Sequence, residues 1–109
     1  MPDEQLSAVA LAHAQDMIVR DYLAHITPDG KTLRDRLAEG GAEEVTSAGE
    51  NIQRNARPQK QTAQAAVDWF MNSAPHRYNL LNNHYNCLGV GVVEGPVGWY
   101  TFVLVFAQR

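Results

Sequence analysis

The sequence of 109 residues has a single cysteine, Cys87, so no disulfide bond can form within the chain and its stability must come from packing. It also lacks any apolar run near the roughly 20 residues that a membrane-spanning helix requires. Nine Lys and Arg stand against twelve Asp and Glu, for a formal net charge of −3, and the basic residues form no cluster. A nucleic-acid-binding protein normally carries a basic patch that neutralises phosphates. We therefore expect no nucleic-acid partner and no transmembrane segment.

The first residues, Met1-Pro2-Asp3-Glu4, are acidic where a secretory signal peptide is basic, and the apolar stretch that follows them is short. If the native protein is exported, we expect its leader to have been trimmed from this sequence. No repeat, linker or low-complexity tract divides the chain. Its length and its 45% hydrophobic content suit one globular domain over residues 1–109.

Two helices are expected in the first half of the chain. From Gln5 to Leu23, apolar side chains recur mainly at steps of three and four residues, as on an amphipathic helix. The tetrapeptide Thr27-Pro28-Asp29-Gly30 predicts a tight turn. Thr32 and Asp35 then form a capping-box pattern that opens a short helix, and Gly40-Gly41 ends it.

Two more helices are expected after the midpoint. The segment from Gln61 to Asn72 has helical periodicity, with Thr62 as its N-cap. Pro75 interrupts this helix, because proline lacks an amide proton and crowds the preceding turn. Ser73 can cap the short helix that follows, which carries His76.

The C-terminal segment differs in kind from the rest. Leu88 to Val93 and Trp99 to Ala107 are rich in β-branched and aromatic residues, and the loop Glu94–Gly98 between them predicts a hairpin. Both faces of the second strand are apolar, so helices must cover the sheet on both sides. The sequence therefore predicts an α+β fold, a three-layer α-β-α sandwich around a small, mainly antiparallel sheet. Gly89 and Gly91 share one face of the first strand, where they allow a close approach.

Four histidines are the first candidates for chemistry. His13 lies within the first helix and is expected to be packed or on the surface, and His84 lies in a turn. His25 and His76 each lie at the end of an element, where functional side chains are often held over a rigid scaffold. By themselves, two histidines so far apart in sequence are weak grounds for a shared site.

Three further groups of residues have competing interpretations. Glu50 lies between Gly49 and Asn51, and this context is equally consistent with a functional carboxylate and with a solvated loop carboxylate. Ser73 and His76 are three residues apart and would form a serine-hydrolase triad with Glu50, but no Gly-x-Ser-x-Gly elbow exposes the serine, which is expected to cap a helix. Trp69 and Phe70 are expected in the core.

Taken in order, five segments resemble the bacterial branch of the CAP superfamily, which includes cysteine-rich secretory proteins, venom allergens and plant pathogenesis-related proteins. The resemblance spans nearly the whole chain and implies an α-β-α sandwich in the cell envelope or outside the cell. The Gly-Glu-Asn-Ile element and the Trp…Ser-x-x-His-Arg-x-Asn element are its most specific parts. The matching segments are Ala14–Met17, His25–Gly30, Gly49–Ile52, Trp69–Asn79 and Gly89–Val92.

The resemblance also implies a site. Members of the family carry two histidines and two glutamates in a central cleft, which His25, Glu50 and His76 match here. The second glutamate falls at Asn72, which cannot ionise, so a pair of carboxylates working as acid and base is not available. Bacterial members often show this shortened tetrad. Glu50 is left as the candidate catalytic residue.

Two neutral imidazoles can bind Zn²⁺ at about 2.0–2.1 Å. His25 and His76 would supply two ligands, fewer than the usual three, so we expect weak and pH-dependent binding, with Glu50 orienting an imidazole or a bound water. We expect a non-enzymatic binding or interaction module for a lipid, glycan or protein ligand that the sequence does not identify. One alternative is a metal-assisted hydrolase acting on a peptide or cell-wall polymer. Another is a purely structural role for the cleft residues.

Overall fold

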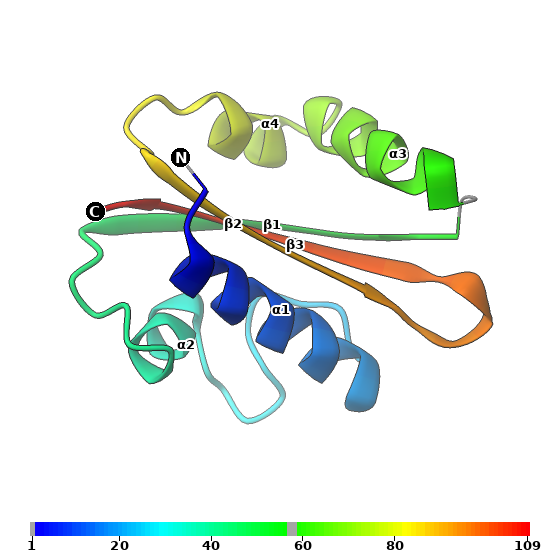
Figure 1. Ribbon diagram of the computed structural model, residues 1–109, viewed down its shortest axis with the longest axis horizontal. Coiled ribbons are helices and arrows are strands. Elements are labelled where there is room, and N and C mark those ends of the chain that lie inside the picture. Colours follow the sequence, from blue (N-terminus) through cyan, green and yellow to red (C-terminus); the bar gives the residue numbers. More distant parts are fainter. Residues whose placement is uncertain (1, 57–58) are drawn as a thin grey trace.

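A computed structural model of the chain describes residues 2–56 and 59–109. Their helices and strands follow one another as α1 (Glu4–Val19), α2 (Leu33–Glu39), β1 (Ser47–Asn55), α3 (Gln59–Met71), α4 (Ala74–Leu81), β2 (Cys87–Glu94), a short 3₁₀ turn (Pro96–Gly98) and β3 (Tyr100–Gln108). The strands form one antiparallel sheet in the order β1-β3-β2. Helices α1 and α2 cover one face of the sheet, and α3 and α4 cover the other (Figure 1). The predicted three-layer α-β-α sandwich is confirmed. None of the described helices has both the length and the apolar character needed to cross a membrane.

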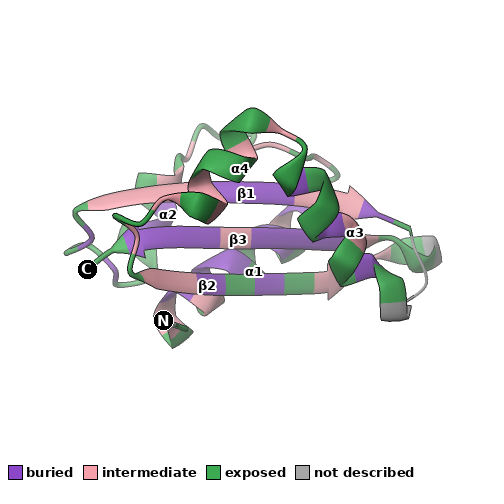
Figure 2. Ribbon diagram, turned by 90° about the horizontal axis from the view of Figure 1, so that it is seen from above, coloured by how far each residue is buried: buried purple, intermediate pink, exposed green. Residues whose placement is uncertain are grey.

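Strand β3 lies at the centre of the sheet and is buried along most of its length (Figure 2). Its side chains alternate between two apolar cores, as its sequence predicts. Val103 and Val105 are fully buried in the core beneath α1, whereas Phe102 packs with Phe70 of α3 in the core on the other face.

Helix α1 lies directly on β2, because two glycines leave room for its backbone. A Cβ atom added at Gly89 would lie 2.2 Å from the carbonyl carbon of Leu6, and one added at Gly91 would lie 2.3 Å from the amide nitrogen of Leu11. Real Cβ contacts are never so short, so only glycine fits at either position. The close approach predicted from these glycines is confirmed.

The short-range signals of the first half are also confirmed. The amide of Gly30, at φ 89°, donates to the carbonyl of Thr27 at 2.9 Å and closes the predicted turn. The capping box of Thr32 and Asp35 opens α2 as expected. The first helix is shorter than predicted, since α1 ends at Val19.

The structure differs from the sequence analysis in the middle of the chain. Thr62 does not cap α3, which includes Gln59, and its hydroxyl donates instead to the side chain of Asn55. Strand β1 was not predicted at all, because its sequence is largely polar and lacks the apolar alternation of a half-buried strand. Glu50 lies within this strand, so the reading of Glu50 as a solvated loop carboxylate is wrong.

Candidate functional site

Glu50 is the buried centre of the candidate site. It pairs with Val105 in the ladder between β1 and β3, and only 2% of its side chain is exposed. Arg36 of α2 donates to both carboxylate oxygens, from Nη1 at 2.7 Å and from Nη2 at 3.0 Å. His25 donates to Oε1 from Nδ1 at 2.9 Å. Both oxygens of Glu50 are therefore engaged by neighbouring side chains.

The environment of Glu50 keeps its carboxylate ionised. Burial by itself would raise the pKa of this group, but the hydrogen bonds from His25 and Arg36, together with the guanidinium charge, hold the pKa below its usual value. A carboxylate with a lowered pKa and two occupied oxygens is a poor general base. Its arrangement suits a group that positions His25.

His25 lies in the segment between α1 and α2, and about half of its side chain is exposed. Because the ionised carboxylate of Glu50 can only accept, Nδ1 of His25 carries the proton, so Nε2 is the ring nitrogen that can offer a lone pair to a ligand. Arg36 also donates from Nη2 to the backbone carbonyl of His25 at 2.8 Å. Both the backbone and the ring of His25 are thus fixed by the same buried ion pair.

His76 lies in the first turn of α4, half-buried against two aromatic rings. Its ring centroid lies 4.8 Å from that of Trp69 and 5.5 Å from that of Phe70. Its Nδ1 shares a hydrogen bond of 2.8 Å with the hydroxyl of Ser73. Burial lowers the pKa of His76, and the charge of a protonated His25 lowers it further.

Asparagine side chains attach α4 to β1 beside Glu50. Asn51 donates to the backbone carbonyl of His76 at 3.0 Å, and Asn79 donates to the side-chain oxygen of Asn51 at 2.9 Å. Glu50 and Asn51 are consecutive in a strand, so their side chains point to opposite faces of the sheet. The carboxylate of Glu50 accordingly reaches α2 and His25, whereas His76 lies on the face covered by α4.

Asn72, the fourth residue expected in the cleft, is exposed and directly follows α3. Its side-chain amide donates to the backbone carbonyl of Asp68, one turn earlier, at 2.7 Å. Among the hydrogen bonds of the described residues, none joins Asn72 to His25, Glu50 or His76. The structure therefore joins His25 to Glu50 directly, connects the backbone of His76 to the next residue of β1, and leaves Asn72 at the end of α3.

Arg36 is the site residue that sequence reasoning missed. It lies three residues after Leu33, on the same face of α2, and it is buried like its neighbour Leu37. A charged residue on the apolar face of a short helix requires a buried partner of opposite charge. That signal was present, but it did not identify Glu50 as the partner.

Trp69 also departs from its prediction. Phe70 is fully buried as expected, but 46% of Trp69 is exposed. Trp69 lies edge-on to Phe70 and tilted against the ring of His76, so it forms part of the wall around this histidine. The reading of Trp69 as a core residue is wrong.

The arrangement differs from that of a serine-hydrolase triad. In such a triad the histidine contacts the serine through one ring nitrogen and the carboxylate through the other. Here Ser73 contacts Nδ1 of His76, whereas Glu50 contacts His25. The nitrogen that would orient His76 against a carboxylate is thus already used by Ser73.

A family model described as the cysteine-rich secretory protein family, or CAP, matches residues 1–107 of the chain. The chain belongs to this family. Two proteins of Bacillus subtilis, the membrane protein YlbC and the protein YkwD, are each 40% identical to it, over 83% and 89% of this chain. The chain spans 25% and 36% of the lengths of these two relatives, so it corresponds to one part of each.

Solved structures of three bacterial proteins have the same fold. An extracellular protein of Bacillus anthracis with an SCP domain is 36% identical, with a TM-score of 0.80 over 99% of this chain and 33% of its own. An outer surface protein of Borrelia burgdorferi has a TM-score of 0.85 at 19% identity, over 99% of this chain and 76% of its own. A cysteine-rich secretory protein of Staphylococcus aureus has a TM-score of 0.69 at 22% identity, and the match covers 99% of this chain and 31% of the other chain. The last two similarities concern the fold alone.

Proposed function

We propose that this CAP domain is an extracytoplasmic binding module whose cleft binds a divalent metal ion weakly and reversibly through His25 and His76. The proposal rests on the orientation of His25. Glu50 fixes the Nδ1 proton of this half-exposed ring, so that the lone pair of Nε2 is available to a ligand. The descriptions of two structural relatives as an extracellular and an outer surface protein support the location.

The donor set limits how tightly a metal ion can be held. Within residues 2–56 and 59–109, no three His, Cys, Asp or Glu side chains are grouped closely enough to form a metal site. Glu50 is committed to Arg36 and His25, so two imidazoles would be the protein's ligands. Zn²⁺ supplied to such a site would act as a Lewis acid with open positions for water or a partner.

The proposal is tested by calorimetric titration of Zn²⁺ into the protein at neutral pH. We expect micromolar or poorer affinity, lost in His25→Ala and in His76→Ala. His84→Ala is the matched control, because His84 is an exposed histidine in the turn before β2. Nanomolar binding, or binding that survives both substitutions, would overturn the proposal. Thermal unfolding of the same variants separates lost binding from lost stability, and a change in stability alone would indicate a purely structural role.

A metal-assisted hydrolase acting on a peptide or cell-wall polymer is the alternative function. It requires a base, and Glu50 is the candidate that the family pattern offers. The occupied oxygens and lowered pKa of Glu50 favour the binding module instead. Peptide and glycan substrates tested with and without Zn²⁺ distinguish the two functions. Turnover that is abolished by Glu50→Gln would establish the hydrolase.

A further inference from the structure

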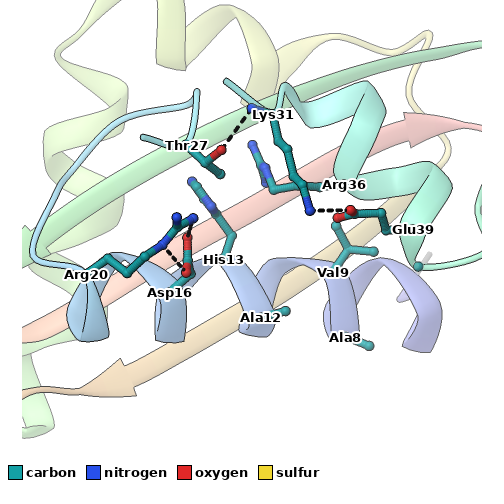
Figure 3. A pocket seen from close by; sticks show the side chains of 11 residues that line it. Ala8, Val9, Ala12, His13, Asp16, Arg20, Thr27, Lys31, Arg36 and Glu39 are labelled. Atoms are coloured by element: carbon teal, nitrogen blue, oxygen red, sulfur yellow. Dashed lines mark hydrogen bonds and ion pairs between the residues drawn. The ribbon is translucent and has the colours of Figure 1, made fainter. Parts of the chain in front are cut away.

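The cavity between α1 and α2 is lined by charged side chains that already have partners (Figure 3). A charged ligand entering this cavity would have to compete with an existing ion pair. A second cavity, at the C-terminal end of α1, differs because its two charged side chains are not paired. The ion pairs at the first cavity are Asp16 with Arg20, Lys31 with Glu39, and Arg36 with Glu50.

The second cavity lies where the sheet extends beyond α1. Helix α1 ends at Val19, whereas the hairpin of β2 and β3 continues past the end of the helix (Figure 1). The cavity has a volume of about 520 Å³, within the range of about 300–1,000 Å³ that is typical of small-molecule sites. It is therefore large enough for a small organic molecule.

One part of the cavity wall is apolar. Ile18 lines it from the last turn of α1, Pro96 from the 3₁₀ turn, and Trp99 from the residue that follows this turn. Trp99 is 45% exposed. An exposed tryptophan offers a large, flat apolar surface, and a ligand that covers it gains hydrophobic free energy. The wall therefore favours a ligand with an apolar body.

Arg54 of β1 lines the cavity and is held in place without being neutralised. Its Nε donates to the hydroxyl of Thr101 at 2.9 Å, and its Nη2 donates to the backbone carbonyl of Tyr22 at 3.3 Å. Both acceptors are uncharged, and none of the ion pairs within residues 2–56 and 59–109 includes Arg54.

The third terminal nitrogen of Arg54, Nη1, is available to a ligand. It takes part in no hydrogen bond of the described chain, in which the buried side-chain atoms without a partner belong to His13 and Arg36. Nη1 is therefore accessible from outside the protein rather than enclosed. A guanidinium nitrogen binds most strongly to an anionic oxygen, through charge-assisted hydrogen bonds. Arg54 thus favours a ligand with a carboxylate.

Asp21 supplies a negative charge to the same cavity. It follows α1 in the left-handed conformation, at φ 56°, and the next amide, that of Tyr22, donates to the carbonyl of Met17 at 3.0 Å. Arg54 bonds to the carbonyl of Tyr22, so its guanidinium lies beside the residue that adjoins Asp21. Even so, no ion pair joins Arg54 to Asp21, whose exposed carboxylate has no partner among the described residues.

We propose that this cavity binds a small zwitterion with an apolar body, of the class of free apolar α-amino acids. The ligand's carboxylate accepts from Arg54 Nη1, its ammonium group donates to Asp21, and its side chain covers Trp99. An α-amino acid carries both charges on one carbon atom, so it fits between two protein charges that do not meet each other. The site uses neither the candidate histidines nor a metal ion, and it therefore goes beyond the function proposed above.

The test is an NMR titration of the ¹⁵N-labelled protein with L-phenylalanine, L-leucine and glycine. We expect the indole N–H signal of Trp99 to shift saturably with at least one of the two apolar amino acids, at concentrations on the order of millimolar. Glycine has no apolar body and should bind about fivefold or more weakly. The indole N–H of Trp69, which packs against His76 on the other face of the sheet, is the internal reference and should not shift.

Two analogues of phenylalanine test the charges without any change to the protein. Phenylalaninamide lacks the carboxylate and should bind about tenfold or more weakly, because it cannot accept a charge-assisted hydrogen bond from the half-buried Arg54. N-acetylphenylalanine lacks the ammonium group and should bind about two- to fivefold more weakly. The smaller effect is expected because Asp21 is exposed and water screens its charge.

Asp21→Asn removes the negative charge and keeps a residue type that tolerates the left-handed conformation. It should weaken phenylalanine by about two- to fivefold without weakening N-acetylphenylalanine. Glu43→Gln makes the same change of charge at an exposed position outside the cavity and should leave both affinities unchanged. Trp99→Ala should abolish the preference for phenylalanine over glycine, with the Nε–H signal of Arg54 as the reporter.

Three results would contradict the proposal. The first is the absence of a saturable shift of the Trp99 signal with either apolar amino acid. The second is equal affinity for phenylalanine and its amide, which would exclude Arg54 as the carboxylate's partner. The third is equal affinity for phenylalanine and N-acetylphenylalanine, or for phenylalanine and acetate, which would indicate a site for simple carboxylates in place of a zwitterion.

Discussion

Arg36 and Glu50 form a two-point salt bridge, with N–O distances of 2.7 and 3.0 Å, in which 8% and 2% of the side chains are exposed. It joins α2 to β1, and through the remaining contact of Arg36 with the His25 carbonyl it also holds the segment between α1 and α2. One buried ion pair therefore sets the relative positions of three segments at the candidate site. A charge left in this position without its partner would be strongly unfavourable.

We predict that Arg36→Met lowers the free energy of unfolding by about 3–5 kcal/mol, because it leaves the Glu50 carboxylate buried and unpaired. Urea denaturation measures the change. Adding Glu50→Leu to Arg36→Met should recover part of the loss, since the double variant contains no unpaired charge. Arg77→Met, at an exposed position of α4, should change stability by less than about 0.5 kcal/mol. Equal losses in Arg36→Met and Arg77→Met would contradict the role assigned to the pair.

Alanine at Gly89 or Gly91 is predicted to displace α1 from the sheet. The added Cβ would lie 2.2 or 2.3 Å from the nearest backbone atom of α1, which cannot move away without opening the core. We expect a loss of about 1–3 kcal/mol or more for each variant in urea denaturation. Gly95→Ala is the control, because its nearest neighbour is a side-chain atom of Ile18 at 3.4 Å. Wild-type stability in both Gly89→Ala and Gly91→Ala would show that α1 does not pack as described.

Stability is predicted to fall as the protein is acidified. Burial lowers the pKa of His13 and of His76 in the folded state. Below the ordinary histidine pKa of 6.5 the unfolded chain therefore binds more protons than the folded one, and the free energy of unfolding decreases until the folded pKa values are passed. Glu50 also makes the protein less stable as the pH falls, because its pKa is lowered in the folded state. This effect begins below the ordinary glutamate pKa of 4.5.

Urea denaturation at a series of pH values measures this dependence. An unperturbed histidine titrates around pH 6.5. His13→Gln should therefore reduce the slope of the free energy of unfolding against pH between about pH 7 and pH 5. His84→Gln, at an exposed turn, should leave the slope as in the wild type. A flat profile across that window would mean that the folded protein accommodates charged histidines at no cost.

Asn72→Glu is predicted to strengthen Zn²⁺ binding, because the family pattern has an anionic side chain at this position. In the structure Asn72 is exposed and its amide bonds to the carbonyl of Asp68, so a carboxylate there would be free of that bond. Calorimetric titration measures the change in affinity. Asn83→Glu adds the same charge at another exposed position and should have no effect. If the two variants titrate like the wild type, Asn72 lies outside the metal-binding cleft.

The layered fold could be predicted because its strongest signals are local. The alternation of β3 between two apolar faces, the turn closed by Gly30 and the capping box of Thr32 each depend on neighbours within a few residues. Strand β1 could not be predicted in this way. Its polar side chains become buried only when β3, more than forty residues later, supplies the ladder and the opposing side chains.

The candidate residues show the same division. Sequence alone determined that His25, Glu50 and His76 belong to one family pattern and that an apolar sheet would be covered on both sides. The tertiary structure decided that Glu50 is buried against Arg36, that the ring of His25 is held by Glu50, and that His76 lies on the other face of β1. The physical reason is that a pattern fixes which residues share a face of an element. The identity of a buried charge's partner depends on how distant elements pack.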